Sequence, residues 1–198
     1  MEFTKIKLTK QNTLEVTYKN EDGDIIQFAG ANIVHKDLRE AMNALIPHLS
    51  IITEQREAYG RTLKEVQKDR ITDEGDSSVY KRFNAEGISL SNGEREVALS
   101  GVRILTKAGI VQLQTPRIDL EDADQYEYNN DLSLDIDAVK YEAKAYIEDK
   151  KWGVKEGDLD FRDIDPFNGV EAQEVSITVD ANIGEQPKKR GRKPKKAA

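Results

Sequence analysis

The chain has 198 residues, 37% of them hydrophobic and 34% charged, with 30 basic against 37 acidic residues. It contains no cysteine, which excludes a disulfide framework and thiolate metal sites and fits a reducing compartment. No apolar run approaches the roughly 18–20 residues of a membrane span, and the N-terminal residues lack the apolar core of a signal peptide, so we expect a cytoplasmic protein without membrane contact.

Residues 3–28 are expected to form three antiparallel strands. Apolar residues alternate with polar ones in three runs: Ile6 and Leu8; Leu14, Val16 and Tyr18; Ile26 and Phe28. Gln11-Asn12 and Glu21-Asp22-Gly23 separate the runs, and these residue types accept the positive φ of tight turns.

From Asp37 the apolar period changes to that of a helix. One helical face is apolar, at Leu38, Met42, Leu45, Leu49 and Ile52. Pro47 predicts a kink or a stop near Ile46, and residues 50–55 remain open between helix and strand. Residues 56–77 are charged and are predicted to form a mobile insertion, with a short helix as an alternative because Leu63, Val66 and Ile71 have helical spacing.

A second set of strands and a second helix follow. Ile88 and Leu90 lead into an Asn92-Gly93 turn, a strong hairpin signal, and the alternation then slips at Ser100-Gly101, which suggests a β-bulge. Strands are expected on both sides of a turn at 107–109. A second apolar helical stripe comprises Leu132, Ile136, Val139, Ala143 and Tyr146, and Asp131 or Ser133 is the expected N-cap.

The predicted fold class is α+β, with two antiparallel strands-then-helix units (βββα repeated) whose sheets join or pack together. The units cover about 1–55 and 78–152 of a body that spans 1–152. Residues 153–187 are acidic and rich in glycine and proline, with a weak strand pattern at 175–179, and are predicted to be a largely disordered linker. Residues 188–198 form a basic tail.

Charge is divided unevenly between body and tail. Seven of the 30 basic residues lie in 188–198, which has no acidic residue, so residues 1–187 carry 23 basic against 37 acidic residues. Blocks of like charge at a terminus stay solvated and commonly serve as interaction arms. The tail therefore predicts a polyanionic partner.

The tail contains a short motif. Its residues are Lys188, Lys189, Arg190, Gly191, Arg192, Lys193, Pro194, Lys195 and Lys196. The run Arg190–Pro194 resembles an AT-hook, in which an Arg-Gly-Arg-Pro core lies extended in the minor groove of A·T-rich DNA. Glycine lets the backbone approach the groove floor, and arginines follow the narrow groove, where the potential is most negative. Lys193 departs from the family pattern, because it separates the second arginine from the proline.

The strands-then-helix order of the body is similar, in topology only, to single-strand-binding folds of the PC4, Whirly and PUR type. The resemblance implies base contacts on the sheets, for which the candidates are Lys5, Lys7, Tyr18, Lys19, Arg103, Lys107 and Arg117. The alternative is structural: Tyr18 continues the inward alternation, and strand lysines commonly protect sheet edges.

Nothing in the sequence demands catalysis, since phosphate-binding and nucleophile motifs are absent. His35 and His48 lie before and inside the first predicted helix, where a packed or capping role is favoured. Two acidic clusters are interpreted as solvated loops, with a hard-cation site or a DNA-mimicking surface as the alternative: Asp119, Glu121, Asp122 and Asp124, and Asp158, Asp160, Asp163 and Asp165.

The sequence thus predicts a non-enzymatic accessory protein without a cofactor, from a bacterium, phage or mobile element, that binds DNA through its tail. A·T-rich duplex, single-stranded DNA and RNA remain alternative ligands, the body is an additional candidate for single-strand binding, and a homo-oligomer stays open. The rival interpretation is an acidic protein-interaction or DNA-mimic module whose tail folds back or binds a partner.

Overall fold

The computed structural model describes residues 1–70 and 78–153. All the described residues belong to one compact unit. The basic tail, nearly all of the predicted linker and the acidic cluster at 158–165 lie outside the described residues.

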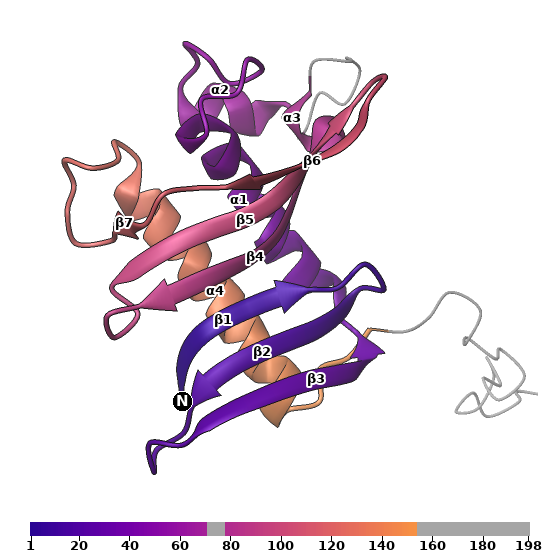
Figure 1. Cartoon of the computed structure of the whole chain (residues 1–198), viewed down its shortest axis with the longest axis vertical. Helices are drawn as coiled ribbons and strands as arrows, with labels where there is room; N and C mark the ends of the chain where they lie inside the picture. The colour runs from indigo at the N-terminus through magenta and orange to yellow at the C-terminus, as the bar shows by residue number, and fades with distance from the viewer. Residues whose placement is uncertain (71–77, 154–198) are drawn as a thin grey trace, which may run out of the picture. The chain divides into compact units, whose positions relative to one another are not determined.

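Within the described residues, seven strands form one antiparallel sheet (Figure 1). They are β1 (Glu2–Leu8), β2 (Thr13–Lys19), β3 (Ile25–Ile33), β4 (Phe83–Ser91), β5 (Glu96–Leu105), β6 (Gly109–Gln114) and β7 (Ile118–Asp119). The order is β3-β2-β1-β4-β5-β6, and β7 pairs with the start of β5. Only Lys5–Ser89, Ile6–Ile88 and Lys7–Gly87 join β1 to β4. Two strand sets that the sequence predicts separately are therefore one sheet with a short junction.

The predicted turns of the sheet are confirmed. Asn12 ends the β1–β2 turn with φ 56° and Gly23 lies between β2 and β3 with φ 90°. In the β4–β5 hairpin, Asn92 and Gly93 have φ of 53° and 66°. These left-handed conformations explain why asparagine and glycine occupy the turns.

The β-bulge lies opposite the predicted position. The register slips between Ala85 and Gly87 on β4, facing Gly101 and Ser100 of β5, so Glu86 is the extra residue. A Cβ on Gly101 would lie 2.3 Å from the carbonyl oxygen of Asn84. Gly101 therefore marks the place where β5 approaches the β4 backbone closely, while the extra residue of the bulge is on β4.

Helix α1 (Lys36–Ile52) continues through Pro47, so of the kink and the stop predicted near Ile46 the stop is wrong. The N-cap is His35, whose Nδ1 accepts from the Asp37 N–H at 3.3 Å. Proline in a helix interior costs about 3 kcal/mol. The helix persists because its apolar face, including Pro47, is buried.

Helix α4 (Asn129–Glu148) begins before the predicted caps, Asp131 and Ser133, so that assignment is wrong. Tyr128 holds the N-cap position without a side-chain cap. The side-chain amide of Asn129 donates instead to the carbonyl oxygens of Asp119 and Asp122, at 2.9 and 3.0 Å. These bonds tie the helix start to the preceding loop.

Two short helices, α2 (Leu63–Lys68) and α3 (Val79–Arg82), lie between α1 and β4. The alternative of a short helix in the insertion is confirmed. Thr62 and Glu65 form a reciprocal capping box at the start of α2, as expected for this residue spacing. Leu63 and Val66 are buried, so α2 is part of the fold.

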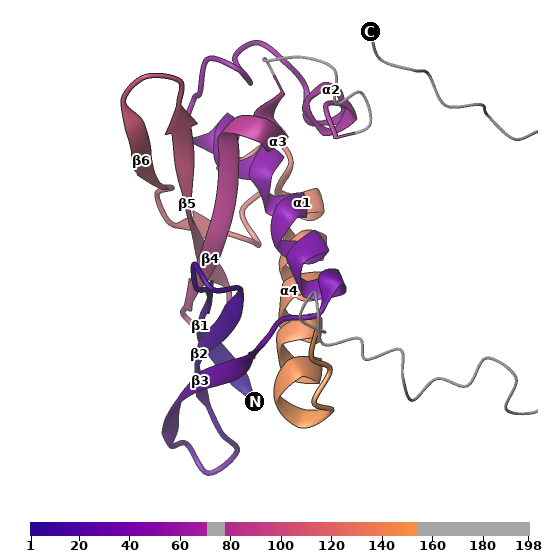
Figure 2. The ribbon, with the colours of Figure 1, turned by 90° about the vertical axis from the view of Figure 1, so that its right-hand side faces the viewer.

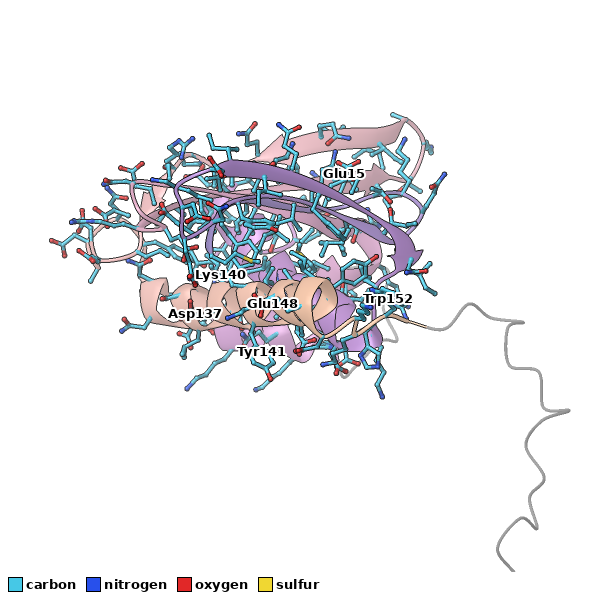
Figure 3. All side chains as sticks on the ribbon, turned by 90° about the horizontal axis from the view of Figure 1, so that it is seen from below. Glu15, Asp137, Lys140, Tyr141, Glu148 and Trp152 are labelled. Atoms are coloured by element: carbon cyan, nitrogen blue, oxygen red, sulfur yellow. The ribbon has the colours of Figure 1, made fainter. Side chains whose placement is uncertain are left out.

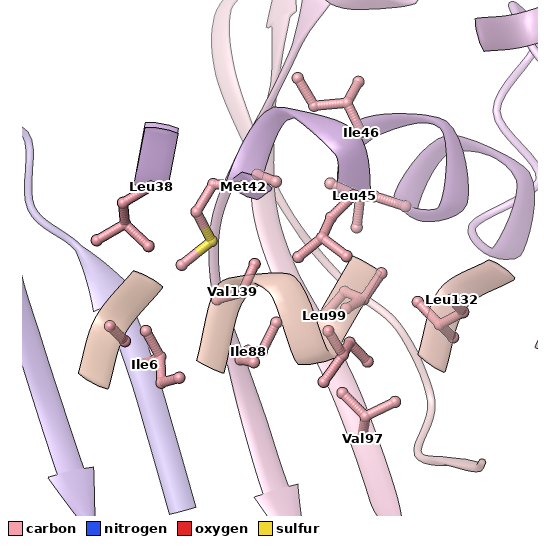
Figure 4. Packing of buried hydrophobic residues seen from close by; sticks show 14 of the residues in the cluster. Ile6, Leu38, Met42, Leu45, Ile46, Ile88, Val97, Leu99, Leu132 and Val139 are labelled. Atoms are coloured by element: carbon pink, nitrogen blue, oxygen red, sulfur yellow. The ribbon is translucent and has the colours of Figure 1, made fainter. Parts of the chain in front are cut away.

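Helices α1 and α4 cover the same face of the sheet (Figure 2). Between them and the strands lies the hydrophobic core (Figure 4), which includes Leu38, Met42, Leu45, Leu49, Leu132, Ile136, Val139, Ile6, Ile88 and Leu99. Both predicted helical stripes are confirmed as buried, apart from the half-buried Ile52. The other face, here called the open face, carries polar residues such as Glu15 (Figure 3).

The α+β class with an antiparallel sheet is confirmed. The two halves do not form a clear repeat of one βββα unit, because α2, α3 and β7 have no counterpart in the first half. None of the described helices combines the length and apolar composition needed to cross a membrane.

Candidate functional site

Lys5, Lys7 and Lys19 lie on the open face, as the alternation predicts. Lys5 and Lys7 are opposite Thr17 and Glu15 in the register of β1 and β2. Both strands are interior to the sheet, so edge protection does not account for these lysines.

Tyr18 does not belong with these lysines. It is opposite Phe3 in the register, packs against the core and meets the Phe3 ring edge to face at 6.3 Å between centroids. The inward interpretation is therefore confirmed, and a base cannot stack on this ring from the open face.

Arg103 does not lie on the open face either, in contrast to its place among the sheet candidates. Its guanidinium donates to Gln55 Oε1 at 3.0 Å and Glu57 Oε1 at 2.7 Å and lies 5.6 Å from the Phe83 ring centre. Strand β5 has no slip of its own, so its alternation continues from Gly101, which meets Leu49 of α1, to Arg103 on the same helix-covered face. There the side chain fixes the α1–α2 connection. Lys107 is exposed in the β5–β6 turn, and Arg117 donates to the hydroxyl of Ser91.

The guanidinium of Arg95 pairs with two carboxylates of the acidic cluster at Asp119–Asp124. Arg95 donates to both carboxylate oxygens of Asp119 at 3.0 Å and pairs with Glu121 at 3.0 Å. The Arg95 hydrogen bond holds the pKa of Asp119 below its ordinary value. No grouping suited to a metal ion occurs among the described histidine and carboxylate side chains.

A cleft of about 590 Å³ opens beside the junction of β1 and β4. The two strands stop pairing after Lys7 and Gly87, where β4 carries its bulge and β1 enters its turn. Arg39 and Asn43 of α1 also line this cleft, together with residues of β1 and β4. The cleft is therefore built by four segments that are distant in sequence.

The cleft has an unusual set of side chains for an acidic protein. Its cations are Lys7, Lys10 and Arg39, its amides are Asn12, Asn43, Asn84 and Gln112, and its carboxylates are Glu15 and Glu86. Within residues 1–70 and 78–153, none of these side chains forms an ion pair or a hydrogen bond. The polar groups of the cleft thus remain available to a ligand.

Lys7 is exceptional among the half-buried cations. The others in the described part of the chain are Arg61, Arg82, Arg103, Lys140 and Lys151, and each of these has a carboxylate within 4 Å. Lys7 has no carboxylate within 4 Å among the described residues, although Glu15 lies opposite it in the register.

A second polar group lies buried between α1 and α4. His48, fully buried, has Nδ1 2.9 Å from the Tyr126 hydroxyl and Nε2 3.2 Å from Asp135 Oδ2. Desolvation raises the pKa of the Tyr126 phenol far above its ordinary value, so the phenol stays protonated and can donate to Nδ1. The packed role predicted for His48 and the capping role of His35 are confirmed.

Of the cleft residues, sequence reasoning singled out Lys7 alone. Lys10, Arg39, Asn43 and Asn84 carried no signal, because they come from three separate segments, the β1–β2 turn, α1 and β4, which only the fold brings together.

No protein-family model matches the chain, and neither a curated protein nor a solved structure resembles it significantly.

Proposed function

We propose that this chain is a non-enzymatic nucleic-acid-binding accessory protein of a bacterium, phage or mobile element, and that its basic C-terminal tail makes the first contact with phosphate. The observation that carries the proposal is the division of charge: seven basic residues and no acidic one in 188–198, against a strongly acidic body. The AT-hook-like core at Arg190–Pro194 supports a minor-groove mode on A·T-rich duplex.

The strength expected of such a tail limits its role. Seven charges neutralise about four to six phosphates, with a slope of log K against log salt near −0.9 per phosphate and a Kd on the order of 10⁻⁴–10⁻⁶ M. Contact of that strength tethers a protein without specifying a sequence. The body then supplies a second contact or is itself the cargo.

Deleting residues 188–198 should abolish retardation of A·T-rich duplex in a gel. A full-length chain with Arg190→Lys and Arg192→Lys is the matched control, because it keeps all seven charges. A hook in the minor groove predicts that this variant loses A·T preference, whereas a simple charge contact predicts that it binds like the wild type. Unchanged retardation after deletion contradicts the proposal.

A second candidate follows from the excess of acid in residues 1–187. The tail would fold back onto this acidic body, or bind a partner, in a protein-interaction or DNA-mimic module. Small-angle scattering over a salt series separates the two, because a folded-back tail predicts a radius of gyration that grows strongly with salt in the absence of DNA.

We also propose that the two halves repeat one strands-then-helix architecture. Each has three consecutive antiparallel strands followed by a long helix, and the first strands of the halves, β1 and β4, pair at the centre of the sheet. The helices α2 and α3 and strand β7 lie outside this repeated pattern.

A further inference from the structure

We propose that the cleft beside β1 and β4 binds a single nucleic-acid strand, with phosphates on Lys7, Lys10 and Arg39 and base edges on the amides. This inference rests on the proposed function and gives the body a nucleic-acid contact of its own, separate from the tail.

The charge of the cleft supports an anionic ligand. Lys7 is half-buried, and a partly buried cation is more favourable beside a counter-ion than without one. Elsewhere in the described residues the protein supplies a carboxylate to every cation of similar burial. A phosphate bound in the cleft would give Lys7 the counter-ion that it lacks. Lys10, on the β1–β2 turn, and Arg39, on α1, line the same cleft.

The size of the cleft supports a strand over a duplex. About 590 Å³ lies within the range of about 300–1,000 Å³ found for sites that hold small ligands. Such a volume accommodates a ligand of nucleotide size. A double helix, whose major groove alone is about 12 Å wide, cannot enter it.

The remaining side chains match unpaired bases. Asn43, Asn84 and Gln112 each offer a donor and an acceptor, and Glu15 and Glu86 can accept from exocyclic amino groups such as cytosine N4. In a duplex the Watson–Crick edges are already paired, whereas a single strand presents them freely. No aromatic residue lines the cleft, so phosphate contacts, and with them salt dependence, should dominate the affinity.

The test compares two full-length triple variants that remove equal charge. The cleft variant is Lys7→Gln, Lys10→Gln and Arg39→Gln. The control is Lys5→Gln, Lys19→Gln and Lys107→Gln, which removes exposed cations outside the cleft. Fluorescence anisotropy measures binding of a short mixed-sequence single strand and of its duplex across a salt series, and circular dichroism confirms that both variants are folded.

We expect the cleft variant to reduce the slope of log K against log salt for the single strand by about 2, corresponding to three lost phosphate contacts. The control should change the slope by about 1 or less. Equal losses in both triples overturn the cleft site and leave the tail proposal intact. Loss of single-strand binding in the cleft variant, with no effect of deleting 188–198, supports the cleft and contradicts the role of the tail.

Lysine footprinting of the wild-type full chain provides a measurement that needs no substitution. Saturating single strand should protect Lys7 and Lys10 from acetylation and leave Lys5 and Lys107 reactive. Uniform protection of all four overturns the site. A free nucleoside monophosphate that competes as well as the strand, at equal nucleotide concentration, also overturns the proposal and assigns the cleft to a small phosphorylated ligand.

Discussion

The phenol oxygen of Tyr126, in the loop before α4, lies 2.9 Å from Nδ1 of His48, a fully buried residue of α1. The opposite ring nitrogen of His48 lies 3.2 Å from Asp135 of α4. One imidazole thus links both covering helices and the loop between β7 and α4. Because both ring nitrogens have partners, the side chain is stabilised where an unpaired imidazole would be unfavourable.

Replacing Tyr126 by phenylalanine should lower the free energy of unfolding by about 1–3 kcal/mol, because it leaves a buried ring nitrogen without its partner. Urea unfolding followed by circular dichroism measures this change. Tyr128→Phe is the matched control, since Tyr128 packs beside Tyr126 and its hydroxyl has no hydrogen bond to any other described residue. An equal effect of both substitutions would contradict the role assigned to the hydrogen bond.

Gly87→Ala should weaken the junction between the two halves. A Cβ there would lie 2.6 Å from the carbonyl oxygen of Ile6 and 3.1 Å from Cα of Lys7, so β1 and β4 could not keep their spacing. Overpacking of this kind costs about 1–3 kcal/mol. Ser89→Ala on the same strand should be nearly neutral, and an equally small effect at Gly87 would show that the junction tolerates displacement.

Arg103→Gln should reduce stability without changing nucleic-acid affinity, because the guanidinium binds Gln55 and Glu57. Hydrogen bonds to charged groups contribute about 1.5–3 kcal/mol. Lys107→Gln removes the same charge from the turn of the neighbouring hairpin and should leave the free energy of unfolding unchanged. Anisotropy with a single strand checks affinity, and a selective loss of binding in Arg103→Gln would place this residue back among the ligand contacts.

Asp69 should make the stability of the fold depend on acid pH. Arg61 donates to both of its carboxylate oxygens, at 2.6 and 3.0 Å, and this holds the pKa of Asp69 below its ordinary value of 3.8. A carboxyl whose pKa is lower in the folded state adds stability above its unfolded pKa, and this stability is lost as the pH falls through the folded pKa.

Asp69→Asn should therefore be less stable than the wild type near neutral pH, and the difference should shrink below a pH of about 4. Urea unfolding at a series of pH values measures it. Asp22→Asn is the control, since Asp22 is an exposed turn residue without a partner among the described residues. A difference between wild type and Asp69→Asn that is constant with pH would rule out the ion pair as its source.

Local patterns predicted the elements of this fold well, and long-range relationships poorly. Alternation placed Val16 and Tyr18 on the core face, and helical spacing identified the buried stripes of α1 and α4. The α4 cap was misassigned because Asn129 bonds to carbonyls of the preceding loop, a contact that no spacing within the helix encodes.

The candidate site was less predictable, for a physical reason. Arg39 and Asn84 line one cleft, but nothing local distinguishes them from other surface polar residues. Their proximity depends on the antiparallel pairing of β1 with β4, and alternation specifies which face a residue occupies without specifying which strand lies beside it. The expectation for Arg103 fails for another reason: the slip predicted at Ser100-Gly101 lies on β4, so the unbroken alternation of β5 brings Arg103 to the helix-covered face.

The brevity of the β1–β4 ladder has a mechanical consequence. Three residue pairs join β1 to β4 at the point where the two strands diverge. Helix α1, which contacts β4, β5 and α4, supports this junction on the covered face of the sheet. A ligand that widened the cleft would therefore strain these three residue pairs before the rest of the sheet. Amide hydrogen exchange at Lys7 and Gly87 should then accelerate while the β2–β3 and β5–β6 ladders remain protected. Exchange at the β1–β4 junction would therefore report on the opening of the cleft.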